Sequence, residues 1–186
     1  CTQELWQAVM GENPSSFNGD LENPVEGVSW RKAQNFIQEL NGKVPCLKAG
    51  LPTEAQWEYA CRAGTTSAFS FGDKANPEQI NCEFVTYSQE FGAKRVHMKT
   101  APVKSLTPNS WGLYEMHGNV SEWCSDWYGE YPEFDQIDPQ GPDSGINRVA
   151  RGGTWYHFAE LSRSASRGRL WERSESKLVG FRISSK

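Results

Sequence analysis

The chain has 186 residues, a length that suits one domain with a substantial core. Eight Trp, nine Phe, 17 Gly and 10 Pro favour a loop-rich fold held together by large aromatic side chains over a helix bundle. The sequence has no run of about 18 apolar residues and no apolar region like that of a secretion signal, so no membrane-spanning helix is expected.

The formal net charge of −4 is unevenly distributed. From Arg148 onward nine Lys and Arg face three acids, whereas ten face twenty before it, so the two parts carry +6 and −10. A basic end can attract nucleic acid, but no cluster of Lys and Arg here resembles a nucleic-acid tail. We therefore expect no nucleic-acid partner. Instead, Arg151, Arg163, Arg167 and Arg182 are expected to pair with buried acids from the first part of the chain.

Five cysteines, at positions 1, 46, 61, 82 and 124, show no CxxC pair and no zinc-like spacing. Their odd number leaves at least one unpaired in a monomer, and the sequence assigns no disulfide. Cys1 fits a lipidated N-terminus, but the segment directly after it already has a structured pattern. We favour a chain that begins within a longer protein, so that any targeting or anchoring segment lies upstream.

In chain order, two helices are expected first. Apolar residues at positions 5, 6, 9 and 10 predict a short amphipathic helix over residues 2–10 that ends at Gly11. Ser29 is expected to cap a second helix, which Asn41-Gly42 should stop.

A third helix is predicted to open with a capping box, formed by Thr53 and Gln56, and to end at Gly64. Residues 65–147 are predicted to form loops, turns and short strands. Because the sequence contains no repeat, linker or low-complexity tract, a single α+β domain over residues 1–186, with little regular structure, is expected.

The C-terminal part has a different pattern. Two strand-like segments, 148–151 and 179–184, bracket a long stretch that is neither clean helix nor clean strand. Gly152-Gly153 is expected to let the backbone turn or pack closely at the first of these strands.

One segment has the donor chemistry of a metal site. Glu115 and Glu122 flank a turn over residues 118–120, whose carbonyls could converge with the two carboxylates. Calcium prefers such hard oxygen donors. The alternative is that Glu122 and Asn119 tie down the loop by accepting backbone N–H groups.

The sequence contains no standard catalytic motif. His97, His117 and His157 share no metal-ligand spacing, which argues against a histidine-built metal centre. A GxSxG motif, a P-loop and a GxGxxG motif are all absent, and no nucleophile–base pair can be recognised.

Nine short motifs follow one another along almost the whole chain: Thr2-Gln-Glu-Leu-Trp, Val9-Met-Gly, Asn13-Pro-Ser, Pro24-Val-Glu-Gly-Val-Ser-Trp, Leu51-Pro-Thr-Glu-Ala-Gln-Trp-Glu-Tyr-Ala, Pro108-Asn-Ser-Trp-Gly-Leu-Tyr, Gly118-Asn-Val-Ser-Glu-Trp, Arg148-Val-Ala-Arg-Gly-Gly and Gly180-Phe-Arg. In this order the sequence resembles the formylglycine-generating enzyme, or sulfatase-modifying-factor, family. The resemblance implies a C-type lectin-like fold. It also implies a calcium ion held by Glu115, Glu122 and the carbonyls of Gly118 and Val120.

Two departures from the family pattern concern metals. A second family calcium site would begin near Asn81, but Arg95 stands where its later acidic ligand would be. Formylglycine generators hold copper between two cysteines five residues apart, just after the Gly-Gly segment. Counted from Gly152-Gly153, these positions are His157 and Ser162, and no cysteine follows Cys124. Because Cu(I) needs thiolate ligands, we expect no copper and no formylglycine-generating activity.

The end of the chain also resembles the variable region of proteins that retroelements diversify, which use the same fold to display ligand-binding residues. The resemblance rests on Arg148-Val-Ala-Arg-Gly-Gly-Thr-Trp, on Ala159, Arg163, Ala165 and Arg167, and on Gly180-Phe-Arg. It implies a variable region over residues 148–182.

The genetic code separates scaffold from variable positions in such a region. Randomising the first two bases of an Asn codon leaves a final pyrimidine, which cannot encode Glu, Gln, Lys, Met or Trp. Glu160, Trp171, Glu172 and Lys177 should therefore be scaffold. The admissible variable residues are Tyr156, His157, Phe158, Leu161, Ser162, Ser166, Gly168, Arg169, Leu170 and Leu178. They are expected on one exposed face, where Tyr, Phe and Arg would anchor a ligand. The alternative is that Phe158, Leu161 and Leu170 are core.

We therefore expect a non-catalytic binding protein whose C-terminal face recognises a macromolecular ligand, in the first place a protein. The resemblance implies a cell-surface or outer-membrane lipoprotein, attached to the membrane only through a lipid anchor upstream of this chain. The alternative is an oxidase or sulfatase-modifying-type enzyme with altered chemistry near His157. A catalytically inactive homologue without ligand or variability is the third hypothesis.

Overall fold

The computed structural model describes residues 1–83 and 98–185, so the predictions at Arg95 and His97 lie outside the described residues. Its first helix, α1 (Gln3–Met10), ends as predicted and begins one residue later than predicted. The Thr2 hydroxyl caps it by accepting the Leu5 N–H at 3.1 Å. Gly11 ends it in the left-handed conformation, at φ 81°.

The second helix, α2 (Trp30–Lys43), starts at Ser29 as predicted, but its predicted end is wrong. Asn41-Gly42 does not stop the helix, which continues to Lys43. The Asn41 side chain instead donates to the Ala49 carbonyl and accepts its N–H, at 2.9 and 2.8 Å. This contact fixes the start of the next strand while the helix backbone stays intact.

The third helix, α3 (Glu54–Arg62), opens with the predicted capping box between Thr53 and Gln56. Its left-handed C-cap is Ala63, one residue before the predicted Gly64. Within the described residues, the regular structure after α3 consists of short strands and one 3-10 helix, in agreement with the expected loop-rich fold. None of the described helices is long and apolar enough to cross a membrane.

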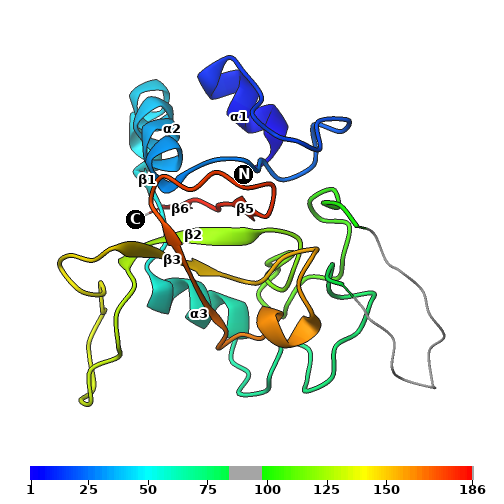
Figure 1. The fold of residues 1–186 in the computed structure, drawn as a ribbon, viewed down its shortest axis with the longest axis vertical. Helices are drawn as coiled ribbons and strands as arrows, with labels where there is room; N and C mark the ends of the chain where they lie inside the picture. Colours follow the sequence, from blue (N-terminus) through cyan, green and yellow to red (C-terminus); the bar gives the residue numbers. More distant parts are fainter. Residues whose placement is uncertain (84–97, 186) are drawn as a thin grey trace.

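The remaining elements are short: η1 (Pro45–Leu47), β1 (Ala49–Gly50), β2 (Ser121–Trp127), β3 (Asn147–Arg151), η2 (Ala159–Ser162), β4 (Arg167–Trp171), β5 (Val179–Gly180) and β6 (Ser184–Ser185). A four-stranded sheet has the order β4-β3-β2-β5, with only the β2–β5 pair parallel, and β1 pairs with β6. Helices α1 and α2 lie on one side of this sheet and α3 on the other (Figure 1).

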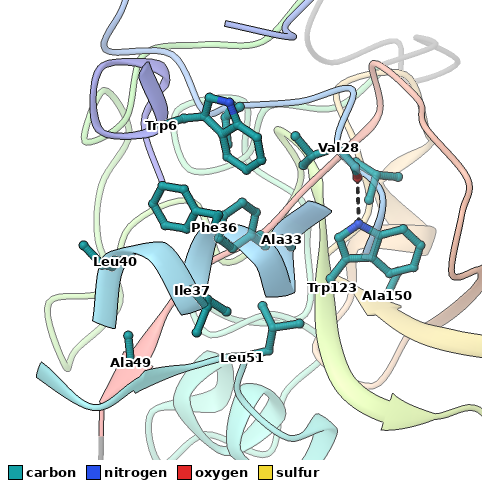
Figure 2. Packing of buried hydrophobic residues seen from close by; sticks show 13 residues of the cluster. Trp6, Val28, Ala33, Phe36, Ile37, Leu40, Ala49, Leu51, Trp123 and Ala150 are labelled. Carbon is teal, nitrogen blue, oxygen red and sulfur yellow. Dashed lines mark hydrogen bonds between the residues drawn. The ribbon is translucent and has the colours of Figure 1, made fainter. Parts of the chain in front are cut away.

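Two cores result from this layering, because neighbouring residues of a strand point to opposite faces. Trp123 and Ala150 join the core under α1 and α2, where Trp6 stacks on Phe36 at 5.1 Å (Figure 2). Their neighbours Cys124 and Val149 pack against Trp57 of α3 in the second core. The Trp123 indole N–H donates to the Val28 carbonyl at 2.9 Å, so this buried polar group is satisfied.

The sequence prediction missed β4. The motif Arg167-Gly-Arg-Leu-Trp has no apolar/polar alternation typical of a strand. All five residues nevertheless pair antiparallel with β3. The strand is set by its neighbour rather than by its own side chains, as is common for strand propensity.

Candidate ligand-binding surface

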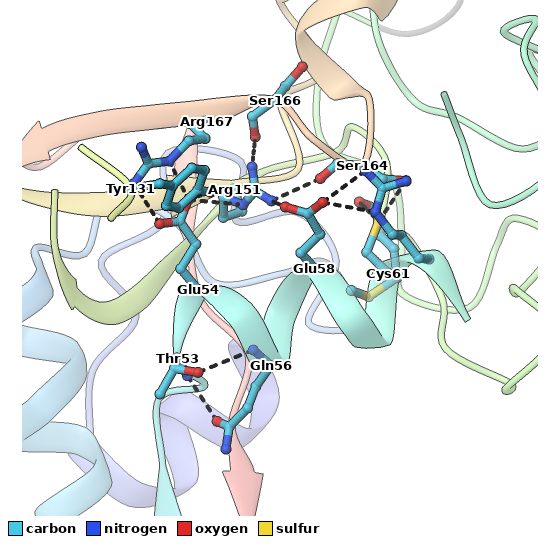
Figure 3. Close-up of polar contacts among 12 residues, drawn as sticks. Thr53, Glu54, Gln56, Glu58, Cys61, Tyr131, Arg151, Ser164, Ser166 and Arg167 are labelled. Carbon is cyan, nitrogen blue, oxygen red and sulfur yellow. Dashed lines mark hydrogen bonds and ion pairs between the residues drawn. The ribbon is translucent and has the colours of Figure 1, made fainter. Parts of the chain in front are cut away.

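A buried arginine on β3 holds the C-terminal stretch in place. Arg151 is 1% exposed, and its guanidinium forms an ion pair with Glu58 and lies 3.5 Å from Glu54, both on α3 (Figure 3). It also donates to the carbonyl of Ser166 and, at 2.9 Å, to that of Ser164. One side chain therefore fixes the backbone between η2 and β4 against α3.

The predicted pairing of arginines with acids is confirmed at three of four positions. Besides Arg151, Arg167 binds both oxygens of Glu54 at 2.7 Å, and Arg182 binds both oxygens of Glu122. The prediction for Arg163 is wrong, since this exposed side chain donates to the Glu160 carbonyl instead. Three of the nine basic residues of the C-terminal part are thus paired with acids among the described residues.

The Gly-Gly segment turns the chain out of β3, as predicted. Gly152 and Gly153 have φ angles of 94° and 74°, in the region that favours glycine. A Cβ on Gly153 would lie 2.1 Å from Ser162 Oγ and 2.9 Å from Ser162 Cα. The segment therefore brings the chain into close contact with the end of η2.

Three of the predicted variable residues are large apolar side chains exposed within residues 156–161, where a turn leads into η2. Tyr156, Phe158 and Leu161 are 51%, 52% and 53% exposed. We call these three residues the display turn. They are therefore not core, and the half-buried His157 lies among them.

Trp155 supports the display turn from its buried side, a role that the sequence did not reveal. Trp155 is 4% exposed, and its backbone N–H donates to the Asn119 carbonyl at 2.8 Å. The Trp155 ring packs edge-on against Tyr156 at 5.5 Å. Its indole N–H donates to the Lys177 carbonyl at 3.3 Å, which links the turn to the C-terminal segment.

The structure does not bring all ten predicted residues together. Arg169 is exposed on β4, where its guanidinium lies 5.3 Å from the Tyr128 ring. Leu170 and Leu178 are partly buried against the first core, in agreement with the core alternative for Leu170. Ser166 is half-buried, and its hydroxyl donates to the Glu160 carbonyl at 2.9 Å.

Two predicted display residues are corrected by the structure. Ser162 is fully buried, and its carbonyl lies 2.8 Å from the ring of His117. Gly168 is crowded by β3, because an added Cβ would lie 2.9 Å from the Ala150 carbonyl oxygen. The codon criterion depends only on which amino acids a randomised codon can encode and contains no information on burial. It therefore accepted Ser162 and Gly168 as variable residues.

The predicted scaffold residues hold different parts of the segment. Glu172 pairs with Arg31 of α2, and the Lys177 ammonium lies 5.4 Å from the Trp155 ring. Glu160 is exposed but offers its carbonyl to Arg163 and Ser166. Trp171 is 53% exposed, so a residue that a randomised Asn codon cannot encode is not necessarily buried.

The proposed calcium ligands do not fit a calcium ion as they lie. Both oxygens of Glu122 bind the Arg182 guanidinium, and one also accepts the Trp57 indole N–H at 2.7 Å. A dication would compete there with a fixed positive charge. Glu115 accepts the N–H groups of Lys104 and Leu106, at 3.0 and 3.2 Å. Calcium binding stays a prediction that these contacts do not support.

Asn119 fits the alternative to calcium, in which this residue ties down the loop. It adopts the left-handed conformation, at φ 65°. Its amide accepts the Ala101 N–H at 2.9 Å and donates to the Ala101 carbonyl at 3.1 Å. Asn119 therefore ties the loop to a neighbouring segment, whereas Glu122 serves an arginine.

His157 and Ser162, which the family resemblance predicts at the copper-cysteine positions, differ in their surroundings. His157 is half-buried, and burial lowers its pKa. The Ser162 hydroxyl is buried without a hydrogen-bond partner among the described residues. Behind Ser162, His117 Nε2 lies 3.7 Å from Cys61 Sγ, a proximity that sequence spacing did not reveal. All five cysteines are free.

Acid should destabilise the fold through His117. Its Nδ1–H donates to the Ser162 carbonyl and its Nε2 accepts the Ser70 N–H, at 2.8 and 3.0 Å. Burial lowers the pKa of His117 to about 4, below the usual 6.5 of an unfolded chain. The unfolded state therefore binds more protons between these values, and stability falls as the pH drops through this window.

The matched variant is His117→Gln, whose amide can donate and accept without titrating. Between pH 7 and pH 4, the free energy of unfolding should fall by about 2–3 kcal/mol more in the wild type than in this variant. Urea unfolding at several pH values measures the difference. Parallel pH profiles for the two proteins would contradict the role given to His117.

The whole chain, residues 1–186, matches the sulfatase-modifying factor enzyme 1-like domain, so it belongs to this family. The predicted family and its C-type lectin-like fold are thereby confirmed. The chain is 36% identical to the formylglycine-generating enzyme of Streptomyces coelicolor over 97% of its length, but covers 58% of that protein. It is 35% identical to the serine/threonine-protein kinase pkn1 of Chlamydia caviae over 88% of its length, and covers 24% of that relative.

Among solved structures, Treponema denticola variable protein 1 superposes with a TM-score of 0.85 at 31% identity, covering 98% of this chain and 80% of that one. PvdO from Pseudomonas aeruginosa gives a TM-score of 0.76 at 25% identity, covering 90% and 63%. The similarity to a variable protein is compatible with binding without catalysis, whereas the sequence relatives include enzymes. The fold alone does not decide between these functions.

Proposed function

We propose that the protein binds a macromolecular ligand, in the first place a protein, without catalysis, through the display turn. One observation carries this proposal: three large apolar side chains are about half-exposed within six residues, on a turn that buried scaffold residues hold. Exposed apolar groups gathered in this way are typical of interaction sites. Aromatic side chains supply much of the binding energy at such sites.

The proposal includes diversification of residues 148–182 by a retroelement, with the protein at a cell surface through a lipid anchor upstream. The similarity to a variable protein supports it. A near-copy of the DNA for this segment, differing only at adenines and lying beside a reverse-transcriptase gene, is the expected finding. Its absence from the flanking DNA would count against diversification but not against binding.

If the display turn is a binding surface, it should tolerate variation that its scaffold does not. Replacing Tyr156, Phe158 and Leu161 together by Ser should change the free energy of unfolding by less than about 1 kcal/mol per substitution, because exposed substitutions cost little. The buried Ser162→Leu should cost about 1–3 kcal/mol or more through overpacking. Thermal unfolding compares the two variants, and a large loss in the triple variant would make the turn core.

Binding itself can be tested by selection. A displayed library randomised at Tyr156, Phe158, Leu161 and the exposed Arg169 should yield folded binders to a defined protein such as lysozyme. A library randomised at Ser162 and Gly168 should not. Equal yields from both libraries, or none from the first, would refute the proposed surface.

The enzyme alternative is supported by the formylglycine-generating enzymes among the relatives. Counted from Gly152-Gly153, the family's copper positions hold His157 and Ser162, and a histidine with a buried hydroxyl does not supply the thiolates that Cu(I) prefers. We expect no stoichiometric copper uptake and no oxygen consumption with a cysteine-containing peptide. Copper uptake or oxygen consumption that disappears in His157→Ala would establish the enzyme and reject the binding proposal.

A further inference from the structure

A groove distinct from the display turn lies between α3 and the loop over residues 129–142. It has a volume of about 730 Å³, and Asp126, Trp127 and Arg167 belong to its lining. This volume falls in the range of roughly 300–1,000 Å³ that is usual for ligand pockets. Figure 3 shows Glu54, Glu58, Tyr131 and Arg167 of this wall beside the buried Arg151.

The groove has an excess of negative charge. Its lining includes five acids but only two arginines, Arg62 and Arg167. Both arginines, together with Arg151, are committed to Glu54 and Glu58. The exposed Glu130 and Asp135 form no ion pair with the described residues, whereas the buried Asp126 accepts the Glu54 N–H and the Ser125 hydroxyl.

Aromatic rings stand beside these carboxylates. Tyr59 on α3 is 69% exposed, and Tyr131 and Phe134 in the loop are 60% and 70% exposed. Rings of this size usually contribute to cores or interfaces. Their faces attract cations, and the attraction strengthens where water is excluded. Uncompensated carboxylates next to exposed rings therefore favour a positively charged occupant.

The groove wall already binds one cation in this way. The Arg167 guanidinium lies 4.0 Å from the Tyr131 ring centroid and 4.4 Å from that of Tyr128. The same group binds both oxygens of Glu54. A ring face and a carboxylate thus bind a guanidinium together in the groove wall, and the lining offers a further ring, Phe134, beside the unpaired Glu130 and Asp135.

We propose that this groove binds an arginine or lysine side chain of a basic peptide segment in a partner protein. The charge excess and the exposed rings select a cation and repel nucleic acid and anionic lipid headgroups. The volume accommodates more than one side chain, which favours a peptide. This site is separate from the display turn and does not depend on it.

Calorimetry with a capped tri-arginine peptide at low ionic strength tests the proposal. Tri-arginine should bind, more weakly as salt is added, and capped tri-citrulline, which has a similar shape but no charge, should not. Removing two carboxylates with Glu130→Gln and Asp135→Asn should weaken binding about tenfold, since each exposed pair contributes up to about 1 kcal/mol. Phe134→Ala should also weaken it.

Glu133→Gln is the matched control, because Glu133 is exposed in the same loop but does not line the groove. It should bind tri-arginine like the wild type. Equal weakening by Glu133→Gln, equal binding of tri-citrulline, or no binding of tri-arginine would each overturn the proposal. The triple display-turn variant should bind tri-arginine normally, so failure of the display proposal and failure of this one are distinguishable.

Discussion

Replacing Arg151 by Ala should destabilise the protein by about 3–5 kcal/mol, the usual cost of removing one partner of a buried ion pair. The side chain is 1% exposed and lies between two glutamates of α3 and two carbonyls of the C-terminal stretch. Its removal leaves the Glu58 carboxylate short of a partner and the carbonyls of Ser164 and Ser166 without their donor. In a domain of this size the midpoint should fall by roughly 10 °C.

Arg151→Lys should recover only a small part of this loss. An ammonium group is a single point charge, whereas the guanidinium donates in several directions at once. The control is Arg31→Ala on the exposed Arg31–Glu172 pair, where the arginine side chain is 55% exposed. Exposed pairs contribute little, so the control should change stability by less than about 1 kcal/mol. Urea unfolding compares the three variants; similar losses in Arg151→Ala and Arg31→Ala would refute the central role of Arg151.

The sequence predicted those parts of the fold that local chemistry determines. Ser29 and Thr53 cap helices where expected, because a cap depends on a side chain and the N–H groups two or three residues away. Thr2, predicted within the first helix, is its cap. The end of α2 was missed because Asn41 bonds Ala49, a contact that depends on the later chain. Strand β4 was missed for the same reason, since β3 defines it.

For the candidate residues, the sequence predicted the exposure of some and missed the burial of others. Residue type and coding potential identified Tyr156, Phe158 and Leu161, which are exposed on one turn. The same criteria admitted Ser162, which is buried because the Gly-Gly turn presses the chain against it. The burial of Ser162 follows from a contact between backbone segments, and no pattern of side chains in the sequence predicts such a contact.

Arg151 and Gly153 position the backbone around the display turn without using the side chains of the turn. The arginine fixes the backbone after η2, and the glycine fixes where η2 ends, so neither constraint involves the side chains of the display turn. Substitutions in the display turn should therefore change the exposed side chains without moving the backbone that carries them. A binding site and a catalytic site could both be built on such a support, which fits a family whose relatives have different functions.

Replacing Gly153 by Ala should be the most disruptive single-methyl change in this region. Gly153 has φ 74°, and the new Cβ would lie 2.1 Å from Ser162 Oγ and 2.9 Å from Ser162 Cα. The left-handed conformation costs about 1–2 kcal/mol for a residue with a Cβ. Overpacking adds about 1–3 kcal/mol, because the backbone of η2 has to move away. We therefore expect a loss of about 2–5 kcal/mol in the free energy of unfolding.

Gly112→Ala separates the two contributions. Gly112 has nearly the same φ, 77°, but nothing lies within 4 Å of a Cβ built there, so it should show the conformational cost alone. Adding Ser162→Gly to Gly153→Ala removes the closest contact and should recover about 1 kcal/mol or more of the overpacking cost, as a double-mutant cycle would measure. If Gly153→Ala costs no more than Gly112→Ala, or if Ser162→Gly has the same effect in both backgrounds, the close contact does not position the display turn. A large coupling between the two positions instead means that the close packing of Gly153 against Ser162 determines the position of the display turn. The proposed function depends on this turn.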